Sequence, residues 1–146
     1  MNLSEAARAF RRGFDRVPPL TPWTPQAGPQ HFVYHADDVE QVLYGGQAGG
    51  GKSDLLVALP AKWAAKPGFN AIIFRRETPQ LDNLLAKARE IYRRGRPGKS
   101  TAALPTAREN LNDHRWRVPE GGQVRFWHCQ RAEDAHDHDG DEFQFI

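Results

Sequence analysis

A glycine-rich stretch followed by lysine and serine carries the clearest chemistry in this sequence. Residues 46–53, GQAGGGKS, match the pattern G-x-x-x-x-G-K-[ST] in full. Glycines in such a loop allow backbone N–H groups to turn inward around phosphate oxygens, where a Cβ atom would collide. The residues predicted to contact a bound nucleotide are Gly46, Gln47, Ala48, Gly49, Gly50, Gly51, Lys52 and Ser53.

The last two residues of this stretch have distinct predicted roles. Lys52 supplies a positive charge to the outer phosphates and is the predicted catalytic residue, and the Ser53 hydroxyl is a predicted ligand for Mg²⁺. A helix that begins here adds the positive end of its dipole to the same anion site. The competing interpretation is a flexible glycine turn, and a chain of this length matches the pattern by accident in roughly one case in a hundred. The stretch therefore predicts binding of a nucleoside triphosphate with Mg²⁺.

Strands and helices must alternate around the loop to position it. The apolar run 40–44 ends at Gly45 and predicts a buried strand that leads into the loop. Residues 52–65 predict the helix after it, although Pro60 should kink or shorten that helix. Residues 70–74 predict a second buried strand.

The second half of the chain continues this alternation. Thr78 as N-cap and Pro79 at the first helical position predict a helix start, followed by an apolar stripe along 79–93. Residues 114–118 and 123–128 flank a Pro-Glu-Gly-Gly turn and predict a hairpin, and the last four residues predict the opening of another strand. Together these elements predict an α/β P-loop NTPase fold with a central, mostly parallel sheet that is incomplete at the C-terminus.

The chain divides into three predicted parts. Residues 1–17 carry apolar side chains at helical spacing and predict an N-terminal helix. Residues 18–30 contain five prolines and predict an extended linker. Residues 31–146 form the predicted partial ATPase domain.

Composition excludes several other classes of protein. The 146 residues suit one compact domain, and no apolar run approaches the ~20 residues of a membrane span. The N-terminus lacks the apolar region of a signal peptide, and a single cysteine, Cys129, excludes an internal disulfide. A net charge of +2 is too nearly balanced to indicate a nucleic-acid partner by itself.

Hydrolysis needs more than the glycine-rich loop. An acidic residue at the end of a neighbouring strand must hold Mg²⁺, but the strand at 70–74 is followed by Arg75 and Arg76, and the strand at 123–128 is followed by Cys129. Only the strand opening at the C-terminus is placed to deliver such an acid. We therefore expect a truncated piece of a longer protein, with weak or no turnover by itself.

Four segments occur in an order that is similar to a known family. They are residues 42–53 (VLYGGQAGGGKS), 72–81 (IIFRRETPQL), 116–126 (WRVPEGGQVRF) and 140–146 (GDEFQFI). They resemble the P-loop, the second strand with its helix, the W-x-x-P-x-G-G hairpin and the segment before the Walker B strand of the large terminase subunit of tailed bacteriophages. Gln30, in the segment upstream, resembles the region where a glutamine of that family contacts adenine.

The resemblance implies a function and its partners. Large terminase subunits are ATPase motors that couple ATP hydrolysis to translocation of double-stranded DNA into the capsid, so ATP and Mg²⁺ are the expected cofactors. The expected partners are double-stranded DNA, the portal protein, the small terminase subunit and, in the full-length protein, further copies in a ring. The expected location is the cytoplasm of a bacterial host, without a membrane partner. The alternatives are another P-loop ATPase that acts on DNA, of the helicase or recombinase type, or a non-catalytic nucleotide-binding remnant.

Two further groups of residues allow two interpretations each. Arg75 and Arg76 are either phosphate-sensing or subunit-bridging arginines, because guanidinium groups bind phosphate oxygens bidentately, or a solvated strand end. The histidines and aspartates of 130–142 resemble a metal cluster in composition, but they lack the spacing and the cysteine partners that fix metal geometry. We expect a solvated acidic loop there.

Overall fold

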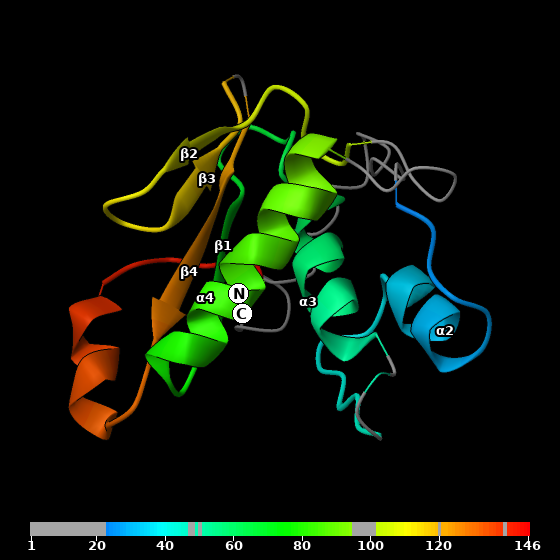
Figure 1. The fold of residues 1–146 in the computed structure, drawn as a ribbon, viewed down its shortest axis with the longest axis horizontal. Helices are drawn as coiled ribbons and strands as arrows, with labels where there is room; N and C mark the ends of the chain where they lie inside the picture. Colours follow the sequence, from blue (N-terminus) through cyan, green and yellow to red (C-terminus); the bar gives the residue numbers. More distant parts are fainter. Residues whose placement is uncertain (1–22, 47–48, 50, 95–101, 120, 139) are drawn as a thin grey trace, which may run out of the picture.

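The computed structural model describes residues 23–46, 49, 51–94, 102–119, 121–138 and 140–146. The helix predicted over 1–17 and the first part of the predicted linker lie outside these residues, as do Gln47, Ala48 and Gly50. The described chain is an α/β structure in which helices pack against a four-stranded sheet (Figure 1). Within that part of the chain, no helix has the length and apolar character needed to cross a membrane.

The sheet is mixed, whereas the sequence predicts a mostly parallel one. Its strands are β1 (Asn70–Arg75), β2 (Arg108–Asn110), β3 (Arg115–Arg117) and β4 (Gln123–His128), in the spatial order β1-β4-β3-β2. β1 and β4 are parallel, but the tight turn before β4 makes the β3–β4 pair antiparallel, and β2 continues that antiparallel ladder. β1 and the predicted hairpin are thereby confirmed.

The C-terminal residues lie along the free side of β1. Phe145 forms a parallel bridge with Ala71, and its carbonyl oxygen accepts a hydrogen bond from Ile72 N at 3.0 Å. Asn70 O accepts a second hydrogen bond from Gln144 N at 2.8 Å. The strand opening predicted at the C-terminus is therefore present as a short parallel contact beside β1.

The apolar run before the glycine-rich loop forms no strand, so the prediction for 40–44 is wrong. Residues 41–46 have no regular secondary structure, and the side chain of Leu43 is 100% exposed. A strand needs a neighbour with free backbone groups. β4 pairs with one side of β1 along its whole length, and Gln144 and Phe145 contact the first residues of the other side, so no ladder with β1 includes residues 41–46.

Three α-helices, a π-helical turn and a 3₁₀-helix complete the regular structure of the described chain. They are α2 (Pro29–His35), α3 (Lys52–Ala61), α4 (Thr78–Arg89), the π-helical turn η1 (Glu90–Arg94) and the 3₁₀-helix η2 (Ala132–His138). α3 ends one residue after Pro60 and does not reach residue 65, because the chain tightens there and Lys62 N donates to Leu59 O at 3.2 Å. α4 begins at Thr78, so its N-cap is Glu77, whose backbone is extended, and not Thr78 as predicted.

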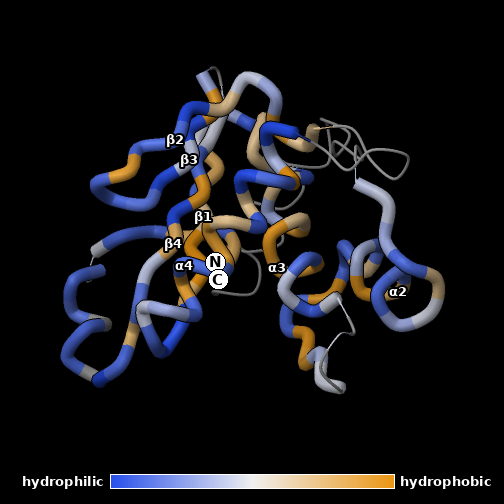
Figure 2. The backbone as a smooth tube through the Cα atoms, in the orientation of Figure 1, coloured by the Kyte–Doolittle hydropathy of each residue, from blue (hydrophilic) through white to orange (hydrophobic). Residues whose placement is uncertain are grey.

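The hydrophobic core lies between the sheet and the pair α3–α4. Trp116 of β3 and Phe126 of β4 are fully buried, and the Tyr92 ring packs edge-on against Trp116 with centroids 5.2 Å apart. The apolar stripe predicted along 79–93 is confirmed as buried: Leu81, Leu84, Leu85, Ala88, Ile91 and Tyr92. Figure 2 shows hydrophobic residues along β1 and α3 and mainly hydrophilic ones along η2.

The hairpin turn crosses the connection between α3 and β1 at close range. Gly122 N donates to Ala64 O at 2.7 Å, and Gln123 N donates to Phe69 O at 2.8 Å. A Cβ atom on Gly122 would collide with the Phe69 carbonyl oxygen. Glycine is therefore needed at this position for the hairpin to dock.

Candidate functional site

Lys52 connects the two described ends of the glycine-rich loop by a hydrogen bond. Lys52 is the first residue of α3, and its Nζ donates a hydrogen bond to the Gly46 carbonyl oxygen at 2.9 Å. Gly51, the N-cap of α3, has a φ of +70°, a conformation that favours glycine. Ser53 follows in the first turn of α3. The Lys52 ammonium and the Ser53 hydroxyl, the two side-chain groups predicted to act at the phosphates, therefore belong to the first turn of the same helix.

Gln30 contacts the end of this loop from α2. Its side chain is buried, its Oε1 accepts a hydrogen bond from Gln26 N, and its Nε2 donates to the Gly51 carbonyl oxygen at 3.0 Å. A Cβ atom on Gly51 would collide with this amide. Both ends of the Gln30 amide thus bind backbone of this chain, and its expected contact with adenine stays a prediction.

A cavity of about 580 Å³ opens beside Lys52 and Ser53. Its volume falls within the ~300–1,000 Å³ typical of small-molecule sites. Its lining residues are Val33, Ala36, Asp37, Val42, Leu43, Tyr44, Lys52, Ser53, Leu55, Leu56, Leu59, Trp63, Arg75, Phe145 and Ile146. The cavity therefore brings the first turn of α3 together with the end of β1 and with an apolar wall.

Asp37 is the one carboxylate among the described residues that line this cavity, and it is already paired. Its partner is Lys62, whose side chain is only 1% exposed and whose Nζ also donates to the Tyr34 carbonyl oxygen at 2.6 Å. Burial, and secondly the charge of Asp37, raise the pKa of Tyr34 to about 12. Asp37 thus serves the contact between α2 and α3.

Ser53, the predicted Mg²⁺ ligand, lines this cavity. Mg²⁺ is held in nucleotide sites by few protein oxygens, with phosphate oxygens and water completing the octahedron. The Ser53 hydroxyl would be one of these oxygens, and the acidic ligand expected from a neighbouring strand is not among the residues that line this cavity. Among the described residues, no three His, Cys, Asp or Glu side chains gather as a metal-binding group.

An ion pair ties the first turn of α3 to α4. Lys87 Nζ lies 2.6 Å from Asp54 Oδ1, and the Asp54 side chain is 11% exposed. Because Asp54 directly follows Ser53, this pair fixes the orientation of the turn that carries the predicted ligands.

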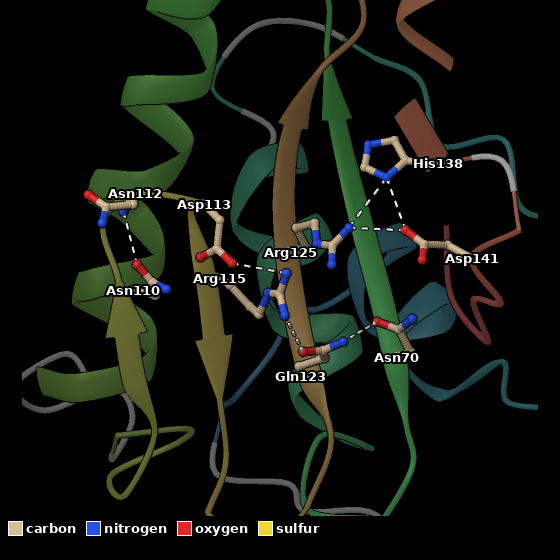
Figure 3. A network of polar contacts seen from close by, with 9 residues as sticks. All are labelled: Asn70, Asn110, Asn112, Asp113, Arg115, Gln123, Arg125, His138 and Asp141. Atoms are coloured by element: carbon tan, nitrogen blue, oxygen red, sulfur yellow. Dashed lines mark hydrogen bonds and ion pairs between the residues drawn. The ribbon is translucent and has the colours of Figure 1, made fainter. Parts of the chain in front are cut away.

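A polar network that the sequence did not indicate covers the opposite face of the sheet (Figure 3). Gln123 and Arg125 alternate with the buried residues of β4 and so point away from α4. Arg115 Nη1 donates to Gln123 Oε1 at 3.3 Å, and Gln123 Nε2 donates to Asn70 Oδ1 at 3.1 Å. These bonds join β3, β4 and β1 by side chains.

His138 belongs to this network, so the prediction of a solvated loop is wrong at this residue. Its side chain is 8% exposed and packs edge-on against Phe74 and Trp127. Its Nδ1 lies 3.3 Å from Asp141 Oδ2, which also pairs with Arg125 at 3.1 Å. The hydrogen bond from His138, and then the charge of Arg125, lower the pKa of Asp141. The 3₁₀-helix η2 folds the histidine back onto the sheet, and residue types alone do not signal that turn.

Comparisons with protein-family models, with curated proteins and with solved structures gave no match for this chain.

Proposed function

We propose that this chain binds ATP with Mg²⁺ at residues 46–53 and is the nucleotide-binding part of a P-loop motor that packages double-stranded DNA into bacteriophage capsids. One observation carries the nucleotide site. Lys52 starts α3 with its ammonium 2.9 Å from the Gly46 carbonyl oxygen, and it lines a cavity of about 580 Å³ together with Ser53.

The side chains of the site have complementary tasks in this proposal. The Lys52 ammonium leaves the Gly46 carbonyl and pairs with outer phosphate oxygens, and the N-terminal end of α3 adds its partial positive charge. Ser53 provides a hydroxyl ligand to Mg²⁺, which supplies charge neutralisation on the phosphates when bound. Gln30 keeps the Gly51 backbone in place while the lysine moves.

The wider assignment to a packaging motor rests on the order and spacing of four segments in the sequence. The proposed partners follow from this assignment. They are double-stranded DNA, the portal protein, the small terminase subunit and further copies in a ring. The proposed location is the cytoplasm of a bacterial host. The α/β architecture, with the loop at the start of a helix that packs on β1, supports this assignment.

A titration with ribose-labelled ATP tests the nucleotide site. We expect Lys52→Ala to lower the affinity by at least about tenfold, because a hydrogen bond to a charged group contributes ~1.5–3 kcal/mol. Arg76→Ala is the matched control, since Arg76 is exposed and borders neither this cavity nor the one described below. An unchanged affinity in Lys52→Ala, with the fold intact by circular dichroism, would contradict the site.

Binding without turnover is a second candidate function, and the engagement of Asp37 by Lys62 favours it. Phosphate release with and without double-stranded DNA separates the candidates. Turnover that duplex DNA stimulates supports the motor, whereas binding without phosphate release in a chain that also carries the expected Mg²⁺-holding acid supports the second candidate. Separation of the two strands would instead indicate a helicase.

A further inference from the structure

We propose that Arg75 is a phosphate-binding residue that contacts the terminal phosphate of a bound triphosphate and so distinguishes it from a diphosphate. This inference rests on the function proposed above, and it assigns a role to a side chain outside the glycine-rich loop. Arg75 is the last residue of β1, at the end of the strand that leads into α4.

Two cavities meet at Arg75. The first is the cavity of about 580 Å³ that contains Lys52. The second measures about 260 Å³ and is lined by Ser53, Arg75, Gln80, Asn83, Leu84 and Lys87. Arg75 and Ser53 line both cavities, so the guanidinium and the predicted Mg²⁺ ligand border the same two spaces.

Within the described chain, the Arg75 guanidinium has most of its donors unused. Its one hydrogen bond there is long, from Nη1 to the Phe74 carbonyl oxygen at 3.4 Å. The other cation of the smaller cavity, Lys87, is engaged by Asp54 at 2.6 Å. Arg75 is therefore the cation of this cavity that an incoming anion can recruit without breaking an ion pair.

The backbone of Arg75 is held by hydrogen bonds within the sheet, whereas most donors of its side chain are unused within the described chain. Arg75 pairs with His128 in the parallel ladder of β1 and β4, and its carbonyl oxygen accepts a hydrogen bond from Cys129 N at 2.8 Å. A rigid attachment point lowers the entropy that is lost when a side chain binds an anion. This favours a binding role over that of a solvated strand end.

Lys52 and Arg75 differ in the geometry of their hydrogen-bond donors, and this difference suits binding to two different phosphates. Lys52 is a point charge at the helix start, whereas the planar guanidinium offers several donors that match two oxygens of one phosphate. A contact of Arg75 with the last phosphate would be lost in a diphosphate. The preference for triphosphate over diphosphate therefore measures the role of Arg75.

Affinities for two labelled nucleotides test the inference. Wild type, Arg75→Ala, Arg75→Gln and the control Arg76→Ala are each titrated into ribose-labelled ADP and a ribose-labelled, non-hydrolysable ATP analogue. We expect Arg75→Ala and Arg75→Gln to weaken binding of the ATP analogue by about tenfold or more, and binding of ADP by less than about twofold. Arg76→Ala should leave both affinities and their ratio unchanged.

The outcomes separate this inference from the proposed function. If Lys52→Ala abolishes binding but the Arg75 variants lose both nucleotides equally, or neither, the inference is overturned and the nucleotide site stands. A wild type that binds both nucleotides with equal affinity overturns the inference as well. A wild type that binds neither overturns both proposals. If Arg75→Ala does not unfold cooperatively and is therefore not properly folded, Arg75→Gln still tests the inference, because it keeps a polar side chain of similar length.

Discussion

The Gln30 side-chain amide donates a hydrogen bond of 3.0 Å to the carbonyl oxygen of Gly51, 21 residues further along the chain. Gly51 is the N-cap of α3 and directly precedes Lys52. Packing of α2 therefore determines where the backbone of the glycine-rich loop turns into the helix. The position of the lysine depends on a residue that lies outside the loop.

Replacing Gln30 should loosen the start of α3. Gln30→Glu keeps the acceptor for Gln26 N but places a carboxylate oxygen against the Gly51 carbonyl, so we expect a loss of about 1–3 kcal/mol in the free energy of unfolding. Urea unfolding measures this loss. Gln41→Glu, the same change at an exposed glutamine, should change stability by less than about 0.5 kcal/mol. Equal effects of the two substitutions would contradict the anchoring role.

Gly122→Ala should destabilise the hairpin against the α3–β1 connection. The added Cβ collides with the Phe69 carbonyl oxygen, and neither backbone can move without breaking the hydrogen bond from Gln123 N. We expect a cost of about 1–3 kcal/mol, as for overpacking in a core. A lowered midpoint in thermal unfolding would show it.

Gly45→Ala is the control for this substitution, because a Cβ at Gly45 meets no atom of the described residues within 4 Å and its φ is not in the left-handed region. It should leave the midpoint unchanged or raise it slightly, since alanine restricts the unfolded chain more than glycine does. Similar midpoints for the two alanine variants would show that the hairpin accommodates the extra carbon.

Removal of Asp37 should cost more than removal of its partner, Lys62. In Asp37→Ala the buried ammonium of Lys62 loses its counter-charge, whereas Lys62→Met removes the charge and keeps an apolar side chain of similar length. We expect Asp37→Ala to lower the free energy of unfolding by about 1–3 kcal/mol and Lys62→Met by less. Asp38→Ala, at the exposed neighbour, controls for the change in net charge. A larger loss in Lys62→Met would reverse the interpretation of this pair.

Stability should fall in alkaline solution because of two buried tyrosines. Burial raises the pKa of Tyr92, whose hydroxyl donates to Val57 O at 2.8 Å, and burial raises the pKa of Tyr34 to about 12. In the unfolded chain both lose their protons near pH ~10. Above that pH the unfolded state binds fewer protons than the folded state, so the free energy of unfolding declines as pH rises. Below it, these groups contribute no pH dependence.

Urea unfolding at several pH values measures this decline. Tyr34→Phe should make the decline above pH ~10 less steep, because one of the two linked protons is gone. Tyr92→Phe should do the same, after an initial loss of stability from the missing hydrogen bond to Val57 O. Slopes identical to that of the wild type in both variants would mean that other groups cause the alkaline loss.

The local spacing of apolar residues was enough to predict the elements whose burial is determined by their own sequence. The helical spacing of Leu81, Leu84 and Leu85 predicts the buried stripe of α4, and the apolar run 70–74 predicts β1. Both predictions succeed because the spacing of apolar residues within an element determines which of its faces is buried. The run 40–44 also ends in apolar residues but forms no strand, because pairing depends on a neighbouring strand as well as on local residues.

The candidate site was predictable in its residue types but not in its supports. The pattern of 46–53 locates Lys52 and Ser53 at the start of a helix, as the structure has them. The contact of Gln30 with Gly51 joins segments distant in sequence, and no local spacing encodes it. The cavity shared by Ser53 and Arg75 likewise arises only when β1 and α3 pack together.

β1 obtains its partners from parts of the chain that are synthesised after it. Its parallel neighbour β4 begins at Gln123, and the contact on its other side comes from Phe145. Ribosomes add roughly 5–20 residues per second, so an apolar strand leaves the ribosome seconds before it can pair. Unpaired strand edges of this kind promote aggregation. The yield of folded protein should therefore depend on how fast the segment after β1 is translated and on chaperones that cover β1 in that interval.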